Sequence, residues 1–268
     1  MDVILAHNLS IGYHLPKGRV KTVHSSLDVA LKEGTLTCLM GLNGAGKSTL
    51  LKTLCGLLPP LGGEVLVYGR KLDAYGAHEL SRVIGVVLTG SGNVSGMTVR
   101  ELVSIGRYPH TGFFGRLRES DEVVVRDAAA SVGLLSKLEC NISELSDGER
   151  QKAFIAKVLA QECPIIILDE PTSFLDIVSR IDILFLLKSI AKEQQKSILL
   201  STHDIDTAIK LADRLWLLPD AKDENVTIGS PNELIDNGKL EKMYNFELDS
   251  EKNKIIKEIL KRTDGIQY

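Results

Sequence analysis

Gly41-Leu42-Asn43-Gly44-Ala45-Gly46-Lys47-Ser48 is the stretch that decides the fold. It matches the phosphate-binding pattern G-x-x-x-x-G-K-[ST], follows the apolar run Thr35–Met40 and opens the helical pattern Lys47–Leu57. The glycines let the backbone curl so that several N–H groups face one point, and a helix N-terminus attracts phosphate. We expect Lys47 to neutralise the β- and γ-phosphates and Ser48 to bind Mg²⁺. The residue pattern alone is also compatible with a Gly-rich turn that binds no ligand. The flanking strand and helix favour a nucleotide site instead.

Strand-like and helical patterns alternate around this loop. Three of the strand-like runs, Thr35–Met40, Pro164–Leu168 and Ser197–Ser201, are nearly all apolar, which is typical of parallel strands buried on both faces. The other strand-like runs are Val3–Ala6, Glu64–Tyr68, Val83–Leu88 and Arg214–Leu218. The helical patterns are Lys47–Leu57, Val99–Ile105, Val123–Val132, Gly148–Gln161, Arg180–Glu193 and Ile205–Ala212. The alternation predicts an α/β fold with crossover helices, in this case a P-loop NTPase core.

Three regions depart from that alternation. The early strands, up to about residue 88, look antiparallel and predict an N-terminal antiparallel β subdomain. From about residue 91 to 161 only helices and loops are predicted, which indicates an inserted α-helical subdomain. We therefore expect a single domain over residues 1–240, followed by a C-terminal helical tail over residues 241–268. The tail has one apolar stripe, which could pack on its own core or on another subunit: Ile255, Ile256, Ile259 and Leu260.

Composition excludes several classes of protein. The chain has 268 residues, of which 44% are hydrophobic and 25% charged, as in ordinary soluble proteins. A net charge of −3 argues against a nucleic-acid partner. The N-terminus lacks the basic and apolar regions of a signal peptide, and the longest apolar runs are too short to span a bilayer. The four cysteines are dispersed, which favours reduced, buried thiols over a metal site: Cys38, Cys55, Cys140 and Cys163.

Polar residues end two of the apolar runs. Asp169 and Glu170 follow Ile165–Leu168 at the carboxyl edge of the predicted sheet, where ligands bind in open α/β folds. We expect Asp169 to orient Mg²⁺ and Glu170 to polarise the attacking water. His203 follows the next buried run and could hydrogen-bond the γ-phosphate. The structural alternatives are a solvated strand end for the acids and a bystander role for His203.

A third motif lies between the loop and the acidic strand end. Leu145-Ser146-Asp147-Gly148-Glu149-Arg150-Gln151 opens a helical pattern, and Ser146 with Glu149 also fits a purely structural capping box. The order and spacing of the three motifs resemble those of the ABC-transporter ATPases, whose signature is usually L-S-G-G-Q. The resemblance covers nearly the whole chain. It implies a head-to-tail homodimer with two ATP molecules between the subunits.

The resemblance also implies a set of site residues. Gly41–Thr49 corresponds to the Walker A loop, Ile165–Glu170 to the Walker B strand, and Ser173–Asp176 to the D-loop. Tyr13 takes the place of the ring that stacks on adenine, and His203 that of the switch histidine. The residues implied in catalysis are Lys47, Glu170 and His203. Those implied in nucleotide binding are Tyr13, Gly41, Asn43, Gly44, Ala45, Gly46, Lys47, Ser48, Thr49, Asp176 and, from the partner subunit of the sandwich, Ser146 and Gly148. Those implied in binding Mg²⁺ are Ser48, Asp169 and Thr89.

Two positions depart from the family pattern. Asp147 replaces the first glycine of G-G, so a carboxylate would repel phosphate unless it points away or caps the helix. Thr89 stands where the family has a glutamine that binds Mg²⁺ and senses the transporter. We expect a water molecule to bridge the shorter threonine to the metal.

Segments outside these motifs indicate which group of ABC-transporter ATPases the chain resembles. Thr98–Val103 with Gly106–Thr111, and Ala212–Leu218 with Gly229–Pro231, resemble importers of iron–siderophore complexes, haem and cobalamin. This implies a peripheral ATPase at the cytoplasmic face of the cell membrane, with permease subunits and, indirectly, a substrate-binding protein as partners. The basic, aromatic stretch Arg107–Arg118 is expected to face the permease or else to be a solvated loop. A transporter ATPase for another substrate and a non-transport ABC ATPase stay open as alternatives.

Overall fold

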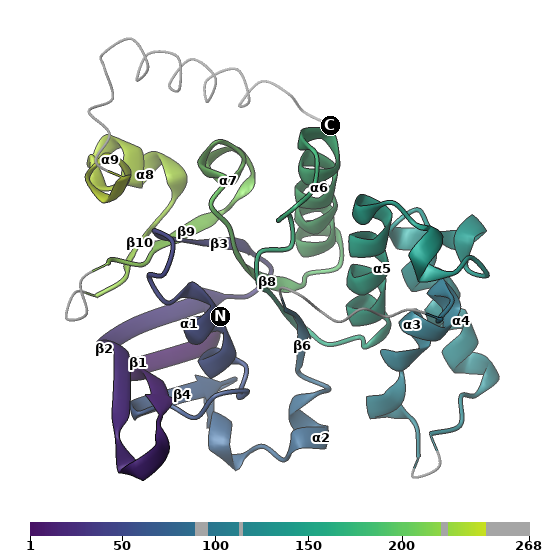
Figure 1. Cartoon of the computed structure of the whole chain (residues 1–268), viewed down its shortest axis with the longest axis horizontal. Coiled ribbons are helices and arrows are strands. Elements are labelled where there is room, and N and C mark those ends of the chain that lie inside the picture. Colours follow the sequence, from purple (N-terminus) through teal and green to yellow (C-terminus); the bar gives the residue numbers. More distant parts are fainter. Residues whose placement is uncertain (89–95, 113–114, 221–224, 245–268) are drawn as a thin grey trace.

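The computed structural model describes residues 1–88, 96–112, 115–220 and 225–244, and its strands form two sheets (Figure 1). Sheet A is antiparallel, with the order β2-β1-β4-β5. Sheet B has the order β10-β9-β3-β8-β7-β6 and is parallel except for β10 at one edge. The strands are β1 Asp2–His14, β2 Val20–Lys32, β3 Leu36–Met40, β4 Gly62–Val67, β5 Arg70–Lys71, β6 Ile84–Val87, β7 Ile165–Leu168, β8 Ser197–Ser201, β9 Arg214–Leu217 and β10 Thr227–Gly229.

Helices follow most strands of sheet B, as the alternation predicts. They are α1 Lys47–Leu54, α2 Ala77–Leu80, α3 Val99–Ile105, α4 Glu119–Ser131, α5 Asp147–Ala160, α6 Ile177–Glu193, α7 Ile205–Leu211, α8 Pro231–Asp236 and α9 Lys239–Tyr244, with a short 3₁₀ turn η3 at Tyr108–His110. Helix α1 ends three residues earlier than expected because Gly56 adopts a left-handed φ of 77°, a common way to terminate a helix. None of the described helices combines the length and apolar composition needed to cross a membrane.

Strands β3, β7 and β8 of sheet B are buried on both faces, which confirms the prediction from their continuous apolar runs. In β7, Ile166 and Leu168 belong to one hydrophobic cluster, with residues of α3 to α7. The alternate residues Ile165 and Ile167 belong to a second cluster, with residues of α1 and of sheet A. Because side chains alternate along a strand, each central strand contributes to both cores.

Sheet A confirms the predicted antiparallel β subdomain but corrects its extent. Strands β3 and β6 also lie before residue 88, yet they belong to the parallel part of sheet B. Strand β2 was not predicted, and β1 extends beyond the expected Val3–Ala6. The pairing of these two strands contains several register shifts, which disrupt the regular alternation of polar and apolar residues that reveals a strand.

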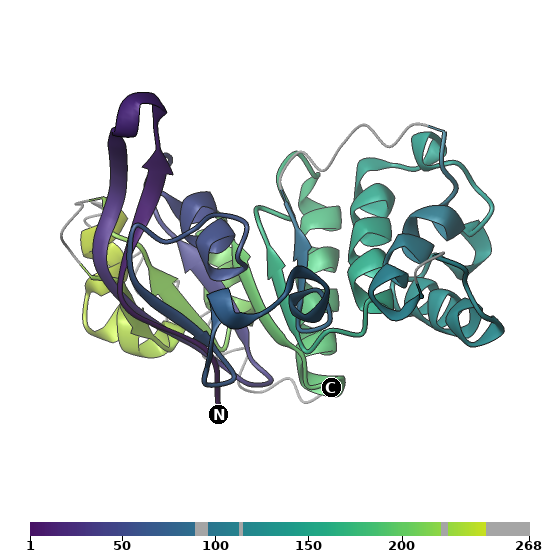
Figure 2. The ribbon, with the colours of Figure 1, turned by 90° about the horizontal axis from the view of Figure 1, so that it is seen from below.

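Between β6 and β7 the described residues form helices and loops, with one isolated bridge from Thr98 to Asn141. Helices α3, α4 and α5 lie together at one end of the molecule, opposite the β1–β2 ribbon (Figures 1 and 2). Gly106 ends α3 where α3 meets α5. A Cβ atom there would lie 2.1 Å from the carbonyl oxygen of Lys157. The two helices can therefore approach this closely only with glycine at position 106.

We expect Gly106→Ala to destabilise the protein by roughly 1–3 kcal/mol, because the backbone of α5 cannot move aside as a flexible side chain would. Thermal unfolding followed by circular dichroism measures the loss. Gly112→Ala is the matched control, since a Cβ at Gly112 meets no atom within 4 Å. Equal melting temperatures for the two variants would contradict the close approach of α3 and α5.

Candidate functional site

The phosphate-binding loop joins β3 to α1 at the carboxyl edge of sheet B. Gly44 and Gly46 have φ angles of 85° and 97°, a region that strains any residue with a side chain. A Cβ on Gly46 would also lie 2.5 Å from Cγ1 of Val23 on β2. The loop is thus curled as its sequence predicts, and sheet A closes against its back.

Lys47 is the first residue of α1 and is 5% exposed. Its ammonium group donates to the carbonyl oxygens of Gly41, at 2.9 Å, and Leu42, at 3.2 Å. Burial lowers the pKa of Lys47, while the negative charges of Glu170 and Asp169 act in the opposite direction. A single cation is therefore held inside the loop, facing the acidic end of β7.

Asp169 joins three segments of the site. Its Oδ1 atom accepts hydrogen bonds from the hydroxyl groups of Ser48, at 3.0 Å, and Ser201, at 2.8 Å. The Ser201 hydroxyl also accepts the backbone N–H of Glu170 at 2.8 Å. Asp169 and Ser201 are almost completely buried. The start of α1 and the ends of β7 and β8 are thereby connected, as expected where parallel strands end side by side.

Glu170 lies one residue beyond Asp169 and has a φ of 49°, an uncommon value for a residue other than glycine. Its Oε2 atom accepts the Ser173 hydroxyl at 3.0 Å. Its Oε1 atom lies 3.3 Å from Nδ1 of His203, whose side chain is half exposed. The backbone conformation and two neighbours therefore direct this carboxylate to the open side of the site, next to the predicted switch histidine. Strain of this kind often accompanies function.

Two of the three predicted metal ligands lie close together, and their binding of Mg²⁺ stays a prediction. Ser48 Oγ and Asp169 Oδ1 converge, and a hydroxyl with a carboxylate suits Mg²⁺, which retains several waters. Thr89, the third expected ligand, lies outside the described residues. In the part of the chain that is described, no group of three or more His, Cys, Asp and Glu side chains could hold a metal. The four cysteines are free: Cys38, Cys55 and Cys163 are buried as predicted, whereas Cys140 is only partly buried. Burial raises the pKa of the Cys38 thiol to about 12, in keeping with an inert, reduced thiol there.

Tyr13 lies near the end of β1 and contacts α1, the helix that follows the phosphate loop. Its hydroxyl lies 2.9 Å from Oγ1 of Thr49, and 37% of the residue is exposed. This hydrogen bond fixes the ring beside α1 while one side stays open. The stacking of Tyr13 on adenine stays a prediction.

The signature motif forms the N-terminus of α5. Ser146 is the N-cap: its hydroxyl accepts the backbone N–H of Glu149 at 3.3 Å, and the Glu149 carboxylate accepts the Ser146 N–H at 3.2 Å. The structural alternative, a capping box, is therefore present. Ser146 is exposed all the same, so the cap leaves the end of the helix accessible. Asp147 forms an ion pair with Arg150 at 2.8 Å, which offsets the charge that distinguishes this motif from the family pattern.

Asp176 and Gly148 meet through one serine. Asp176 caps α6, with its carboxylate accepting the backbone N–H and the hydroxyl of Ser179 at 3.0 and 2.6 Å. The Ser179 hydrogen bonds lower the pKa of Asp176. A Cβ on Gly148 would lie 2.8 Å from the Ser179 hydroxyl oxygen. The N-termini of α5 and α6, which carry the predicted signature and D-loop, therefore pack directly against each other.

The predicted residues thus fall into two groups. Lys47, Ser48 and Asp169 gather at the carboxyl edge of sheet B, with Glu170 and His203 beside them. The signature residues begin α5, which packs on the face of sheet B opposite to the face covered by α1. The described contacts include no bond between the two groups.

The structure adds three residues that the sequence did not identify. Ser201 and Ser173 hold the acidic pair, and both occur within motifs that were already recognised. His24 is different: it lies on β2, is 1% exposed, and has Nε2 2.7 Å from the carbonyl oxygen of Ala45 in the phosphate loop. Because a carbonyl only accepts, Nε2 carries the proton, and Nδ1 is buried without a hydrogen-bond partner among the residues that the structure describes. Nothing in the sequence pattern of β2 signals this contact.

The stretch Arg107–Arg118 is predicted to face a permease or to be a solvated loop. In the structure some of its side chains point inward and others point outward. Arg107 is 6% exposed and His110 donates from Nε2 to the Gln161 carbonyl oxygen, so these two side chains turn inward. Tyr108 and Leu117 are exposed, at 58% and 41%. Phe113 and Phe114 lie outside the described residues, and of the described part of this stretch only the outward-facing side chains can meet a partner.

Residues 24–173 match the sequence family described as ABC transporter. The chain belongs to this family. The ferric enterobactin transport ATP-binding protein FepC of Escherichia coli strain K12 is 39% identical over 83% of this chain and 82% of that protein. The achromobactin transport ATP-binding protein CbrD of Dickeya dadantii is 33% identical over 92% of this chain and 89% of that protein. The dimeric structure of the bacterial ABC transporter cassette MJ0796 superimposes with a TM-score of 0.72 at 26% identity, covering 85% of this chain and 98% of that one.

These matches agree with the α/β architecture and with the nucleotide site described above. This ABC transporter family member binds and hydrolyses ATP. The family assignment from the three motifs is confirmed.

We expect His24→Leu to weaken ATP binding about five-fold. Leucine still fills the space under the loop but removes one hydrogen bond, whose net contribution is typically about 1 kcal/mol. Titration with a fluorescent ATP analogue measures the change. His7→Leu is the control, because His7 lies half exposed on neighbouring β1. Unaltered affinity in a folded His24→Leu variant would remove His24 from the support of the loop.

Proposed function

We propose that this chain is the ATP-hydrolysing subunit of an importer, in which ATP-driven closure of a homodimer moves a membrane permease. The observation that carries the proposal is the connected set Ser48, Asp169, Ser201, Glu170 and His203 at the mouth of the phosphate loop. These residues would surround the γ-phosphate of a bound ATP with two hydroxyls, two carboxylates and an imidazole. Their geometry suits phosphoryl transfer to water.

Backbone N–H groups of residues 41–49 and the positive end of α1 would hold the phosphates of ATP. Asn43, Ala45 and the loop glycines contribute through the backbone, and Thr49 through its bond to Tyr13. On binding, Lys47 would exchange its present carbonyl acceptors for the β- and γ-phosphates. Tyr13 offers its open face to the adenine ring.

Ser48 and Asp169 would hold Mg²⁺, which supplies neutralisation of phosphate charge, and Thr89 would contribute through water. Glu170 is the group that would polarise the attacking water, since its carboxylate is oriented by Ser173 and by its own backbone. His203, 3.3 Å from that carboxylate, would hold Glu170 and the γ-phosphate in line. The acid and the imidazole thereby act as one unit.

The signature residues suggest how hydrolysis becomes motion. Ser146 and Gly148 begin a helix whose N-terminus attracts anions, but this helix packs on the other face of the sheet from α1. We infer that they complete the nucleotide site of a second copy, with Asp176 at the same contact. A dimeric relative supports this arrangement. ATP would then hold two subunits together, and its hydrolysis would release them.

The cargo follows from similarity. The relatives named for enterobactin and achromobactin transport favour a ferric siderophore, and the importer-like segments 98–111 and 212–231 leave haem and cobalamin as related candidates. The chain would then work at the cytoplasmic face of the cell membrane. There it would contact permease subunits directly and a substrate-binding protein indirectly.

Glu170→Gln tests the ATPase mechanism. We expect ATP binding to persist while hydrolysis falls at least about 100-fold, because general-base assistance is lost. Size-exclusion chromatography with ATP should then show a stable dimer. Glu193→Gln, at the exposed end of α6, should behave as the unmodified chain. A Glu170→Gln chain that turns over ATP at the parental rate would overturn the role of Glu170.

Uptake tests the proposed cargo. The chain is reconstituted into proteoliposomes with the permease that co-purifies with it and the corresponding binding protein. We expect ATP-dependent accumulation of a ferric siderophore in preference to haem or cobalamin, and none with Glu170→Gln. Accumulation of none of the three, despite ATPase activity stimulated by the permease, would show that the transporter carries a different cargo.

A further inference from the structure

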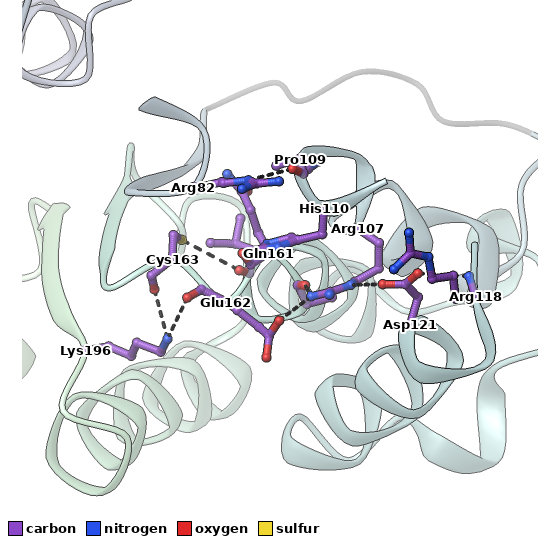
Figure 3. Close-up of polar contacts among 12 residues, drawn as sticks. Arg82, Arg107, Pro109, His110, Arg118, Asp121, Gln161, Glu162, Cys163 and Lys196 are labelled. Carbon is purple, nitrogen blue, oxygen red and sulfur yellow. Dashed lines mark hydrogen bonds and ion pairs between the residues drawn. The ribbon is translucent and has the colours of Figure 1, made fainter. Parts of the chain in front are cut away.

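Arg107 is a buried cation far along the chain from every motif of the nucleotide site. It lies two residues beyond the end of α3 and is 6% exposed. Its Nε donates to Oδ1 of Asp121 on α4 at 2.9 Å (Figure 3). Its Nη1 donates to the carbonyl oxygen of Ala160 at 2.7 Å and to Oε2 of Glu162 at 2.6 Å. One guanidinium therefore joins α3, α4 and the C-terminal end of α5.

The segment that follows α5 is held from other directions as well. His110 Nε2 lies 2.9 Å from the carbonyl oxygen of Gln161. The Gln161 side-chain amide donates to the carbonyl oxygen of Ile84, at the start of β6, at 3.3 Å. Lys196, just before β8, donates to the carbonyl oxygen of Cys163 at 2.9 Å. Helices α3, α4 and α5 are called the helical group below. Residues 161–163 are therefore a junction where the helical group and sheet B share hydrogen bonds (Figure 3).

The position of this junction matters because of what lies on each side. Helix α5 has 14 residues and is about 20 Å long, with Ser146 capping its far end. In the other direction the chain enters β7, which ends at Leu168, one residue before Asp169. A change of angle at the junction would displace Ser146 more than any atom near Arg107. The junction thus relates the signature end of α5 to the acidic end of β7.

We propose that Arg107 is a positioning residue that sets the orientation of the helical group on sheet B, and so the place of Ser146 and Gly148 relative to Asp169 and Glu170. The importance of that orientation for dimer closure depends on the function proposed above. An arginine suits the task because its planar fork bonds in several fixed directions, which the single ammonium of lysine does not. The Arg118 backbone N–H and the Arg107 guanidinium lower the pKa of Asp121, so this acceptor stays ionised. Gly106 adds to the same contact, since it lets α3 lie against the backbone of α5.

A stabilising role alone would also explain a buried ion pair, although such pairs often add little net stability. The decisive readout is therefore geometric and is taken on folded protein. Spin labels at exposed positions Asp127 on α4 and His78 on α2, with Cys140→Ser to avoid extra labelling, report the distance between the helical group and the core. Pulsed electron resonance on the monomer should give one narrow distance for the parent. We expect a broader or shifted distribution for Arg107→Met.

Arg126→Met is the matched control, because Arg126 is exposed on α4, and it should reproduce the parent distance. Arg107→Lys and Glu162→Gln keep the test available if Arg107→Met folds poorly, and both should give intermediate distributions. A parental distance distribution in folded Arg107→Met would overturn the proposal.

The link to function is measured in the Glu170→Gln background. We expect Arg107→Met to bind a fluorescent ATP analogue as the parent does, but to need about five-fold more ATP for half-maximal dimer formation, a typical size for coupling through a packed contact. Dimerisation at parental ATP concentrations would overturn the effect on closure. Should the Glu170→Gln parent itself stay monomeric with ATP, the proposed dimer fails, while the label distance on the monomer still decides the role of Arg107.

Discussion

The site depends on the hydrogen bonds that the Asp169 carboxylate accepts. This carboxylate accepts the hydroxyls of Ser48 and Ser201, so one oxygen joins the start of α1, the end of β7 and the last residue of β8. Buried carboxylates are costly unless they are hydrogen-bonded, and these bonds form only when the three strands are in register. The same register brings the phosphate loop, Glu170 and His203 together. Correct pairing of sheet B and assembly of the site are thus one event.

The antiparallel sheet supports this centre from behind. Val23 prevents any side chain at Gly46, His24 donates to the loop backbone, and Tyr13 is bonded to Thr49 in α1. The phosphate-binding loop therefore contacts both sheets, and not only sheet B, from which it emerges. Such support limits how far the loop can relax, which favours a preformed anion site.

Much of this arrangement could be predicted from the sequence, and the failures have identifiable causes. Strands β3, β7 and β8 of sheet B are predictable because burial on both faces leaves an uninterrupted apolar run, and helices α3, α5 and α7 because their period is regular. The short edge strand β10 has no such run and is missed. Strand β2 was missed because register shifts interrupt its alternation. The roles of Gly41–Ser48 and Asp169 follow from motifs whose chemistry is local. His24 and Arg107 act through contacts between segments distant in sequence, and no local pattern reports such contacts.

The alternation of β7 between two hydrophobic clusters has a consequence for how this protein can change over evolutionary time. Ile165 and Ile167 serve one core, and Ile166 and Leu168 serve the other. Replacing one aliphatic residue by another disturbs a single core by a small volume. Inserting or deleting one residue within the strand would exchange the occupants of both cores and turn Asp169 to the wrong face. Variation in length should therefore accumulate in the connecting loops, while the central strands drift only by substitution.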